Sequence, residues 1–242
     1  MNPHIDRTLL VPALLVVLGM TAPSAVGVAA GQEHPTRLVL MSVRIPSRIE
    51  AHDPAQRFLD SLIQDRLRGA GYQVVPPDSV EPLWQQALDS AGPAFDPVTG
   101  QEDTTKGEVA RQLVMDQART RFAADYLVTP FVGVVKVKFK GSKAKWDGVE
   151  EKTGGPGMFG IRDPYKGILP ALTLFIPVID FQDSVRYEGR GGVQLASKIS
   201  GSDLQAVAMT MLLIDFALLT DATRIALERL GSKIPPITRT LP

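Results

Sequence analysis

The stretch LVLMSVRIPSRIEAHDPAQRFLDSLIQDRLRGAGYQVV, residues 38–75, places two short apolar runs on either side of an amphipathic segment. Leu38–Val43 and Tyr72–Val75 have the length and composition of buried strands. Between them, Asp53 followed by Pro54 is typical of a helix start. The expected buried face of this helix contains Phe58, Leu59, Leu62, Ile63 and Leu67, with Asp60, Gln64, Asp65 and Arg68 opposite. The stretch therefore predicts a strand–helix–strand unit.

Two more helices are expected downstream of this unit. The first begins at Asp78 or Ser79, with Glu81 placed for a capping box, and a turn-rich loop over residues 92–107 follows it. The second is expected over residues 108–124. The candidates for its buried side are Val109, Leu113, Met115, Ala118 and Phe122.

The second half of the chain has the patterns of strands and then of helices. Strands are expected at Tyr126–Val128, Val132–Phe139, Leu172–Ile179, Val185–Glu188 and Gly192–Ala196, with a turn at Gln182–Ser184. Pro177 predicts that its strand ends early or lies at a sheet edge. Ala206–Leu219 is apolar enough for a helix, and Thr220 can cap a last one over Asp221–Leu230. We predict an α/β fold: a mixed sheet flanked by helices in two or three layers, with a long β-hairpin.

The first thirty residues have the features of an export signal. Arg7 precedes the apolar stretch Leu9–Met20, and Val28-Ala29-Ala30 offers small residues for cleavage. The stretch is short for a bilayer-spanning helix, which needs about 20 apolar residues. We expect a signal peptide at 1–30, or alternatively a retained anchor, and then a linker at 31–36, one α/β domain at 37–231 and a tail at 232–242. The expected location is periplasmic or outer-membrane-associated.

Composition excludes several classes of function. Lys plus Arg and Asp plus Glu each number 26, so the formal net charge is zero, whereas general nucleic-acid binders carry a basic excess. The chain contains no cysteine. Thiol catalysis, disulfides and a lipid anchor on cysteine are thereby excluded, and the core must hold the domain alone.

Several stretches are similar to uncharacterised exported bacterial proteins. They are Asp96-Pro97 with Thr99-Gly100, Lys145–Gly148, Pro170–Leu174, Tyr187–Leu195 and Leu218–Asp221. Together with the element order, they resemble the group that contains the amino-terminal domain of the Tol translocation protein, the periplasmic domain of the curli-secretion channel and the activators of penicillin-binding proteins. The likeness spans roughly residues 37–231 and implies an anticodon-binding-domain-like fold with a binding role in the cell envelope. The chain departs from the group in lacking the lipid-anchor cysteine that many members carry.

A run of lysines is the strongest charge feature. On a strand over residues 132–139, Lys136, Lys138 and Lys140 project from one face at spacings of about 6.6–6.8 Å, and Lys143 and Lys145 follow. Such a ladder can contact lipid phosphate, lipopolysaccharide or an acidic partner protein. The alternative is a solvated strand face that discourages aggregation at the sheet edge.

Three apolar residues near the lysines are further candidates for partner binding. Trp146 is either a contact residue or a half-buried hairpin tryptophan. Met158 and Phe159 lie in a long connection expected over residues 147–168, where they either enter a partner or pack back on the domain.

Catalytic and metal sites have weaker support. Asp147, Glu150 and Glu151 can share acid and base work only if they face one cleft. Asp96, Thr99, Glu102 and Asp103 offer oxygen ligands but not the spacing of a calcium loop. We expect no metal, no cofactor and no catalytic residue.

The expected function is therefore binding or scaffolding by a non-enzymatic envelope protein with a protein partner. The alternatives are a subunit of a ring-like secretion assembly and a carboxylate-dependent envelope hydrolase. The apolar stretch Ala206–Leu219 is expected to pack in the core as a helix or, alternatively, to be an interfacial helix or to form a homo-oligomer contact.

Overall fold

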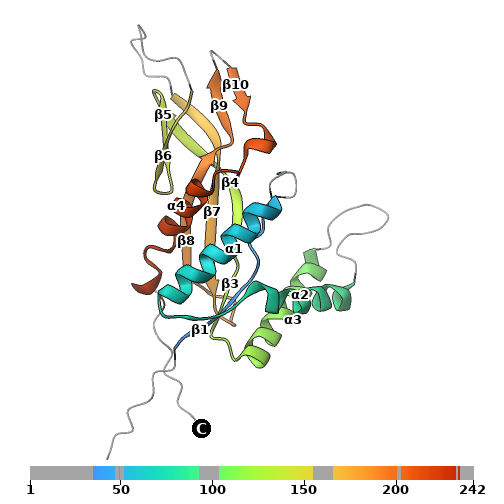
Figure 1. Cartoon of the computed structure of the whole chain (residues 1–242). Helices are drawn as coiled ribbons and strands as arrows, with labels where there is room; N and C mark the ends of the chain where they lie inside the picture. Colours follow the sequence, from blue (N-terminus) through green and yellow to red (C-terminus); the bar gives the residue numbers. More distant parts are fainter. Residues whose placement is uncertain are drawn as a thin grey trace, which may run out of the picture. The chain divides into compact units, whose positions relative to one another are not determined.

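The computed structural model describes residues 35–46, 49, 52–92, 104–154, 166–200, 203–232 and 234, all within one compact unit, Gln32–Pro242. The expected signal peptide lies outside the described residues. The helices are α1 (His52–Gly69), α2 (Pro77–Ala91), α3 (Thr104–Phe122) and α4 (Phe216–Leu227), with short 3-10 turns η1 (Met209–Met211) and η2 (Leu230–Ser232). The strands are β1 (Arg37–Leu40), β2 (Gln73–Val75), β3 (Tyr126–Val128), β4 (Phe131–Lys140), β5 (Lys143–Trp146), β6 (Val149–Lys152), β7 (Lys166–Ile179), β8 (Val185–Leu195), β9 (Ser197–Ser200) and β10 (Asp203–Ala206). Figure 1 shows their arrangement.

Eight of the strands form one mixed sheet. Its order is β2-β1-β3-β7-β4-β5-β6, and β8 pairs with β7. Strand β1 is parallel to β2 and β3, whereas β7 is antiparallel to β3, β4 and β8. Strands β9 and β10 form a separate antiparallel pair. The predicted α/β class, mixed sheet and long β-hairpin (β7–β8) are confirmed.

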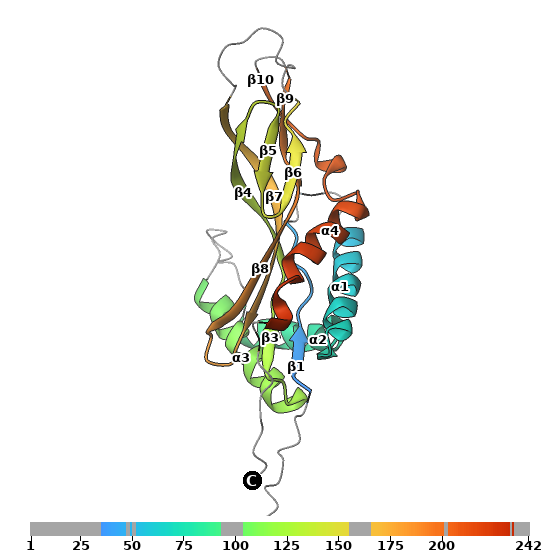
Figure 2. The same ribbon diagram turned by 90° about the vertical axis from the view of Figure 1, so that its left-hand side faces the viewer.

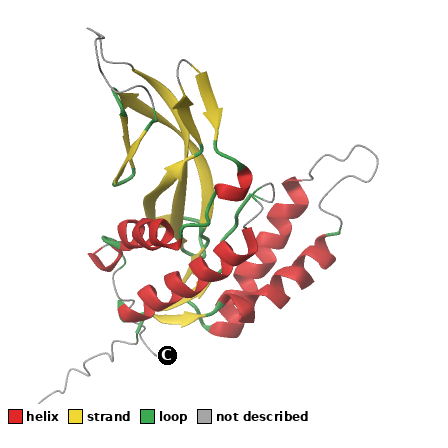
Figure 3. Ribbon diagram, turned by 45° about the horizontal axis from the view of Figure 1, so that its top comes forward, coloured by secondary structure: helices red, strands yellow, loops and turns green. Residues whose placement is uncertain are grey.

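Helices cover both faces of the sheet at the end that contains β1 and β3 (Figure 2). Leu38 and Leu40 of β1 pack in one core cluster with α1 and α4, whereas Val39 packs in another with α2 and α3. This is the alternation that a strand buried on both faces requires. The fold has three layers here, while β4–β7 continue beyond the helices (Figure 3). A third cluster, which includes Val137, Phe139 and Leu169, fills the curl of these strands.

The predicted strand–helix–strand unit is present as β1-α1-β2. Leu59, Ile63 and Leu67 are fully buried along α1, as the helical spacing predicted. Asp60 was expected on the wet face, but its carboxylate accepts a hydrogen bond of 2.7 Å from the Val43 backbone N–H. That bond connects α1 to the chain that leaves β1, so Asp60 is held half-buried.

Three local predictions about helices and strands were wrong. Helix α2 starts at Pro77 after Pro76, with no side-chain cap, so no capping box forms. In α3, Met115 and Ala118 are buried as predicted, but Val109 and Leu113 are 47% and 38% exposed, and Ala110 and Val114 are buried in their place. Pro177 lies in the central strand β7 rather than at an edge, between the residues that pair with β3 and those that pair with β4.

Pro177 is tolerated because the N–H that proline lacks is not needed for a hydrogen bond to β8. Its carbonyl accepts a hydrogen bond of 3.1 Å from Thr129, in the break between β3 and β4. In an antiparallel ladder the N–H and C=O of one residue point to the same neighbour. The missing donor therefore faces that break and not the β8 ladder.

Two longer segments also differ from the prediction. The connection expected over 147–168 begins later, because β6 pairs with β5 in a hairpin. The helix expected at Ala206–Leu219 does not form. Residues 203–206 are strand β10, and α4 starts only at Phe216, where the Asp215 side chain accepts from the Ala217 N–H and caps it. Thr220, predicted as a cap, is therefore inside α4.

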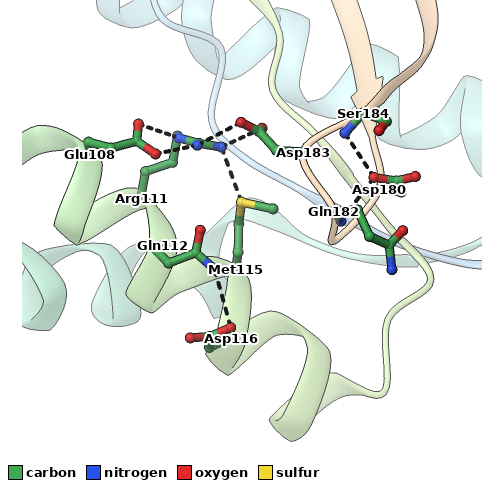
Figure 4. A network of polar contacts seen from close by, with 9 residues as sticks. All are labelled: Glu108, Arg111, Gln112, Met115, Asp116, Asp180, Gln182, Asp183 and Ser184. Carbon is green, nitrogen blue, oxygen red and sulfur yellow. Dashed lines mark hydrogen bonds and ion pairs between the residues drawn. The ribbon is translucent and has the colours of Figure 1, made fainter.

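An ion-pair network connects α3 to the β7–β8 turn (Figure 4). The Arg111 guanidinium donates to both Asp183 carboxylate oxygens, at 2.7 and 3.0 Å, and also to Glu108. Hydrogen bonding to Glu108 and then to Asp183 raises the pKa of Arg111. In the same turn, burial opposes the charge of Asp180, but hydrogen bonds from Ser184 and Arg186 outweigh it and lower the pKa of the Asp180 carboxyl.

Helix α4 approaches β8 so closely that only glycine fits beneath it. A Cβ at Gly191 would lie 1.9 Å from the Ala222 carbonyl oxygen, and one at Gly189 would lie 2.0 Å from that of Ala226. Both clashes are with helix backbone, which cannot rotate away as a side chain can. The two glycines therefore set the distance between α4 and the sheet.

Gly191→Ala is expected to lower the free energy of unfolding by about 2–3 kcal/mol, because α4 must move off β8. Gly69→Ala is the control. No heavy atom would lie within 4 Å of its Cβ, and a change within about 1 kcal/mol is expected. Urea denaturation followed by circular dichroism measures both. Equal midpoints for the two variants would contradict the close approach.

Asp60→Asn is expected to stabilise the protein at alkaline pH. Burial raises the pKa of the Asp60 carboxyl to about 6, against the partly compensating hydrogen bond from Val43. Between about pH 4 and 6 the folded state therefore binds more protons than the unfolded state, and the free energy of unfolding falls as pH rises. Asn keeps an acceptor for Val43 without the charge.

The gain expected for Asp60→Asn at pH 8 is about 1–2 kcal/mol after allowance for solvent screening, and it should vanish near pH 4. Denaturant unfolding at the two pH values measures it. A variant less stable than the wild type at pH 8 would show that the ionised carboxylate stabilises the fold.

Candidate lysine-rich binding face

The register of β4 against its neighbours gathers the lysines on one side of the sheet. Lys136, Lys138 and Lys140 pair with Pro170, Ile168 and Lys166 of β7. Lys140 also pairs with Lys143 at the start of β5. Because alternate residues of a strand share a face, the same side receives lysines from three strands. We define the lysine face as Lys136, Lys138, Lys140, Lys143, Lys145 and Lys166, all exposed.

A groove of about 750 Å³ runs along the lysine face. Its lining includes five of the six lysines, together with Phe139, Gly167 and Ile168. The Ile168 side chain is 59% exposed. The groove therefore combines ammonium groups with the apolar surface of lysine stems and of Ile168.

One carboxylate lies among these lysines. Glu150 of β6 pairs across the hairpin with Lys145, forms an ion pair of 2.7 Å with its ammonium group and forms another with Lys143. The hydrogen bonds from Lys143 and then Lys145 lower the pKa of Glu150 to about 2. Within the described residues, no ion pair involves Lys136, Lys138, Lys140 or Lys166. The lysine face thus keeps a strong positive charge. The pairing of Glu150 with Lys143 and Lys145 is an example of how this face binds a carboxylate.

The other predicted contact residues lie elsewhere. Trp146 is half-buried on β5, packs against the cluster inside the curl, and its indole N–H donates to the Leu172 carbonyl at 3.4 Å. This is a packing position and not part of the groove lining. Met158 and Phe159 lie outside the described residues.

The three carboxylates of the hydrolase hypothesis are engaged in separate places. Asp147 accepts a hydrogen bond of 2.8 Å from the Thr173 hydroxyl. Glu151 accepts one of 2.6 Å from the Leu195 backbone N–H and lies 3.2 Å from the Lys198 ammonium. Glu150 and Glu151 both contribute to the wall of a cavity of about 430 Å³ beside α4. As successive strand residues they point to opposite faces, so their carboxylates do not converge on a shared proton.

In the described part of the chain, no group of three or more His, Asp or Glu side chains is placed to bind a metal ion. The loop with Asp96, Thr99, Glu102 and Asp103 lies outside the described residues. None of the described helices is long and apolar enough to cross a membrane.

Sequence reasoning missed three members of the groove, Lys166, Gly167 and Ile168, and the role of a fourth residue, Glu150. Lys166 and Ile168 belong to β7, which was expected to start only at Leu172. Glu150 was considered as a catalytic acid, whereas it neutralises part of the lysine face. The Asp147-Gly148 pair between the two charged stretches is the signal that predicts a tight hairpin, and such a turn sets Lys145 opposite Glu150.

Comparison with known proteins adds no information about the lysine face. No protein-family model and no curated protein matches it. A solved structure from Helicobacter pylori, described as a neuraminyllactose-binding hemagglutinin homolog, is similar to 85% of this chain and 90% of its own, with 8% identity and a TM-score of 0.32. A likeness this distant carries no argument about the site.

Removing the two lysines that hold Glu150 is expected to raise its pKa. In the wild type the carboxyl should titrate at about 2, and in Lys143→Gln/Lys145→Gln it should return toward 4.5. Because the folded pKa is depressed, the stabilisation is present above the ordinary pKa and is lost as pH falls from about 4.5 to 2. Side-chain NMR titration measures this, with Lys198→Gln as the control. A wild-type value near 4.5 would contradict the ion pairs.

Proposed function

We propose that this chain is a non-enzymatic, exported cell-envelope protein that acts by binding or scaffolding. Its lysine face is the surface that contacts an acidic partner. The proposal places the protein in the periplasm or at the outer membrane, on the strength of the signal-like first thirty residues and the resemblance to bacterial envelope proteins.

The observation that carries the proposal is the convergence of six lysines from β4, β5 and β7 on one groove-bearing face. Like charges placed this close repel each other unless an anion neutralises them. Glu150 neutralises only the β5 side. The β4 and β7 lysines therefore gain interaction energy when an acidic partner binds, which a face kept only for solubility does not require.

Binding is favoured over hydrolysis because the candidate carboxylates are committed to structural contacts. Asp147 fixes Thr173, Glu151 fixes the end of β8, and Glu150 is ionised between two lysines. General acid catalysis needs a carboxyl with a raised pKa, and the pKa of Glu150 is shifted in the opposite direction. These contacts support a fixed surface rather than an acid–base pair.

The test compares charge removal on this face with charge removal elsewhere. The triple variant Lys138→Gln/Lys140→Gln/Lys166→Gln should lose about tenfold in retention by an immobilised envelope extract that contains both membranes and proteins, from about 0.5 kcal/mol per lysine. Glu150→Gln should increase retention, because it frees two ammonium groups. Bound fractions at low and high salt give the measurement.

The control variant Arg57→Gln/Arg68→Gln/Arg119→Gln removes three exposed charges from α1 and α3. It should bind like the wild type, and circular dichroism should show all variants folded. Equal losses in the two triple variants would mean that net charge alone governs retention, and the lysine face would not be the contact surface.

A further inference from the structure

The chain from η1 to the first turn of α4 exposes large apolar side chains. Their exposed fractions are 42% for Met209, 56% for Met211, 46% for Ile214, 42% for Phe216 and 36% for Leu218. We define these five residues as the apolar segment. The stretch that was predicted as one helix thus leaves five large side chains partly exposed, and clusters of exposed apolar groups mark interaction surfaces.

The exposure is built into the fold. Leu212 and Leu213, in the middle of the segment, are 3% and 0% exposed. Leu213 has φ of 62°, a left-handed conformation that bulky residues rarely adopt. This turn lets two successive leucines enter the core while Met211 and Ile214 point outward. Such strain persists only where the surrounding structure holds it, and it is concentrated at functional sites.

Hydrogen bonds and ring stacking hold the segment in place. The Gln194 side chain of β8 accepts from the Leu213 N–H at 3.2 Å and donates to the Met211 carbonyl at 3.4 Å. Phe216 stacks on Phe58 of α1, with ring centroids 4.5 Å apart. Figure 2 shows the start of α4 beside α1 accordingly.

The apolar segment adjoins the lysine face. Gln194, which holds the segment, pairs with Leu172 of β7, and Leu172 pairs with Val134 of β4. Val134 is 48% exposed and lies two residues before Lys136 on the same face of β4. Two strand spacings, about 10 Å, thus separate Gln194 from Val134, and Lys136 lies two residues, about 7 Å, further along β4. The exposed side chain of Val134 therefore lies between the apolar segment and the first lysine of the ladder.

We infer that this composite surface binds an anionic lipid bilayer. The apolar segment enters the boundary between headgroups and acyl chains, and the lysine face contacts the headgroup phosphates. The inference rests on the proposed function and names its acidic partner. It combines the two features that bind peripheral proteins to membranes, inserted apolar area and attraction of lysines to anionic lipid.

Two observations favour a bilayer over other occupants. A second copy docked by two-fold symmetry would bring the same patch against itself, and the adjoining lysine faces would then repel. Protein interfaces are depleted in lysine and enriched in arginine, whereas all five basic residues that line the groove are lysines. Asp215 lies within the segment, but its carboxylate is engaged as the cap of α4.

The experiment is vesicle co-sedimentation of the chain from Gly31 onward, the expected exported form, so that the apolar stretch Leu9–Met20 does not itself bind lipid. Vesicles of phosphatidylcholine are compared with vesicles that contain about 30% phosphatidylglycerol, at about 0.1 and 0.5 M salt. The wild type should bind the anionic vesicles at least tenfold more tightly, with part of the binding surviving high salt.

Matched variants separate the two contributions. Lys136→Gln/Lys138→Gln/Lys140→Gln should abolish the preference for anionic lipid. Met211→Gln/Ile214→Gln should lose about tenfold in affinity and all salt-resistant binding. The control Val109→Gln/Leu113→Gln removes two similarly exposed apolar residues from α3, on the other side of the sheet, and should bind like the wild type.

The outcomes distinguish this inference from the proposed function. Retention by envelope extract that depends on the lysine face, without vesicle binding, would overturn the lipid inference and leave a protein partner. If neither envelope extract nor vesicles bind the wild type, both the proposed function and the lipid inference are overturned. Unchanged vesicle binding by Met211→Gln/Ile214→Gln would overturn the role of the apolar segment. A dimer in light scattering that this same variant dissociates would show that a second copy covers the segment instead.

Discussion

Strand β7 pairs along both of its edges, with β3 and β4 on one side and β8 on the other, and this pairing positions the rest of the molecule. Leu174, Ile176 and Val178 are fully buried on the face covered by α1 and α4. A slip of one residue would turn this apolar row away from the helices, so the register is strongly specified. The glycines of β8 then allow α4 to approach closely enough to seal that face.

The candidate binding surface is a consequence of the same register. Strand β4 extends beyond the helices, so one face of this strand passes from an apolar environment to water. Val132 is buried beneath the helices, while Lys136, Lys138 and Lys140 lie beyond them. Because the β4–β7 ladder continues to Lys140 and Lys166, the uncovered end of the sheet is a rigid platform. Its charges are therefore held at spacings set by the strands and not by flexible loops.

Local periodicity was enough to predict α1, the alternation of β4 and the β7–β8 hairpin. In each of these elements, the apolar residues that follow the local period are also the residues that the core buries. The prediction failed where two signals competed. Residues 206–219 are apolar in the manner of a core helix, yet Leu212 and Leu213 are buried in succession by a left-handed turn. In α3, several apolar residues allow more than one buried face, and packing against α2 selected Ala110 and Val114.

The sequence by itself determined the α/β class, the alternation of lysines along β4 and the lack of cysteine thiols, because these depend on residue identity and on spacing within one element. Tertiary structure alone decided that Lys166 and Ile168 join the lysine face, that Glu150 is a counter-ion and that Trp146 packs inward. It also decided that residues 209–218 turn apolar side chains outward. Each of these depends on pairing between strands distant in the chain, and no local pattern encodes which strand will be the neighbour.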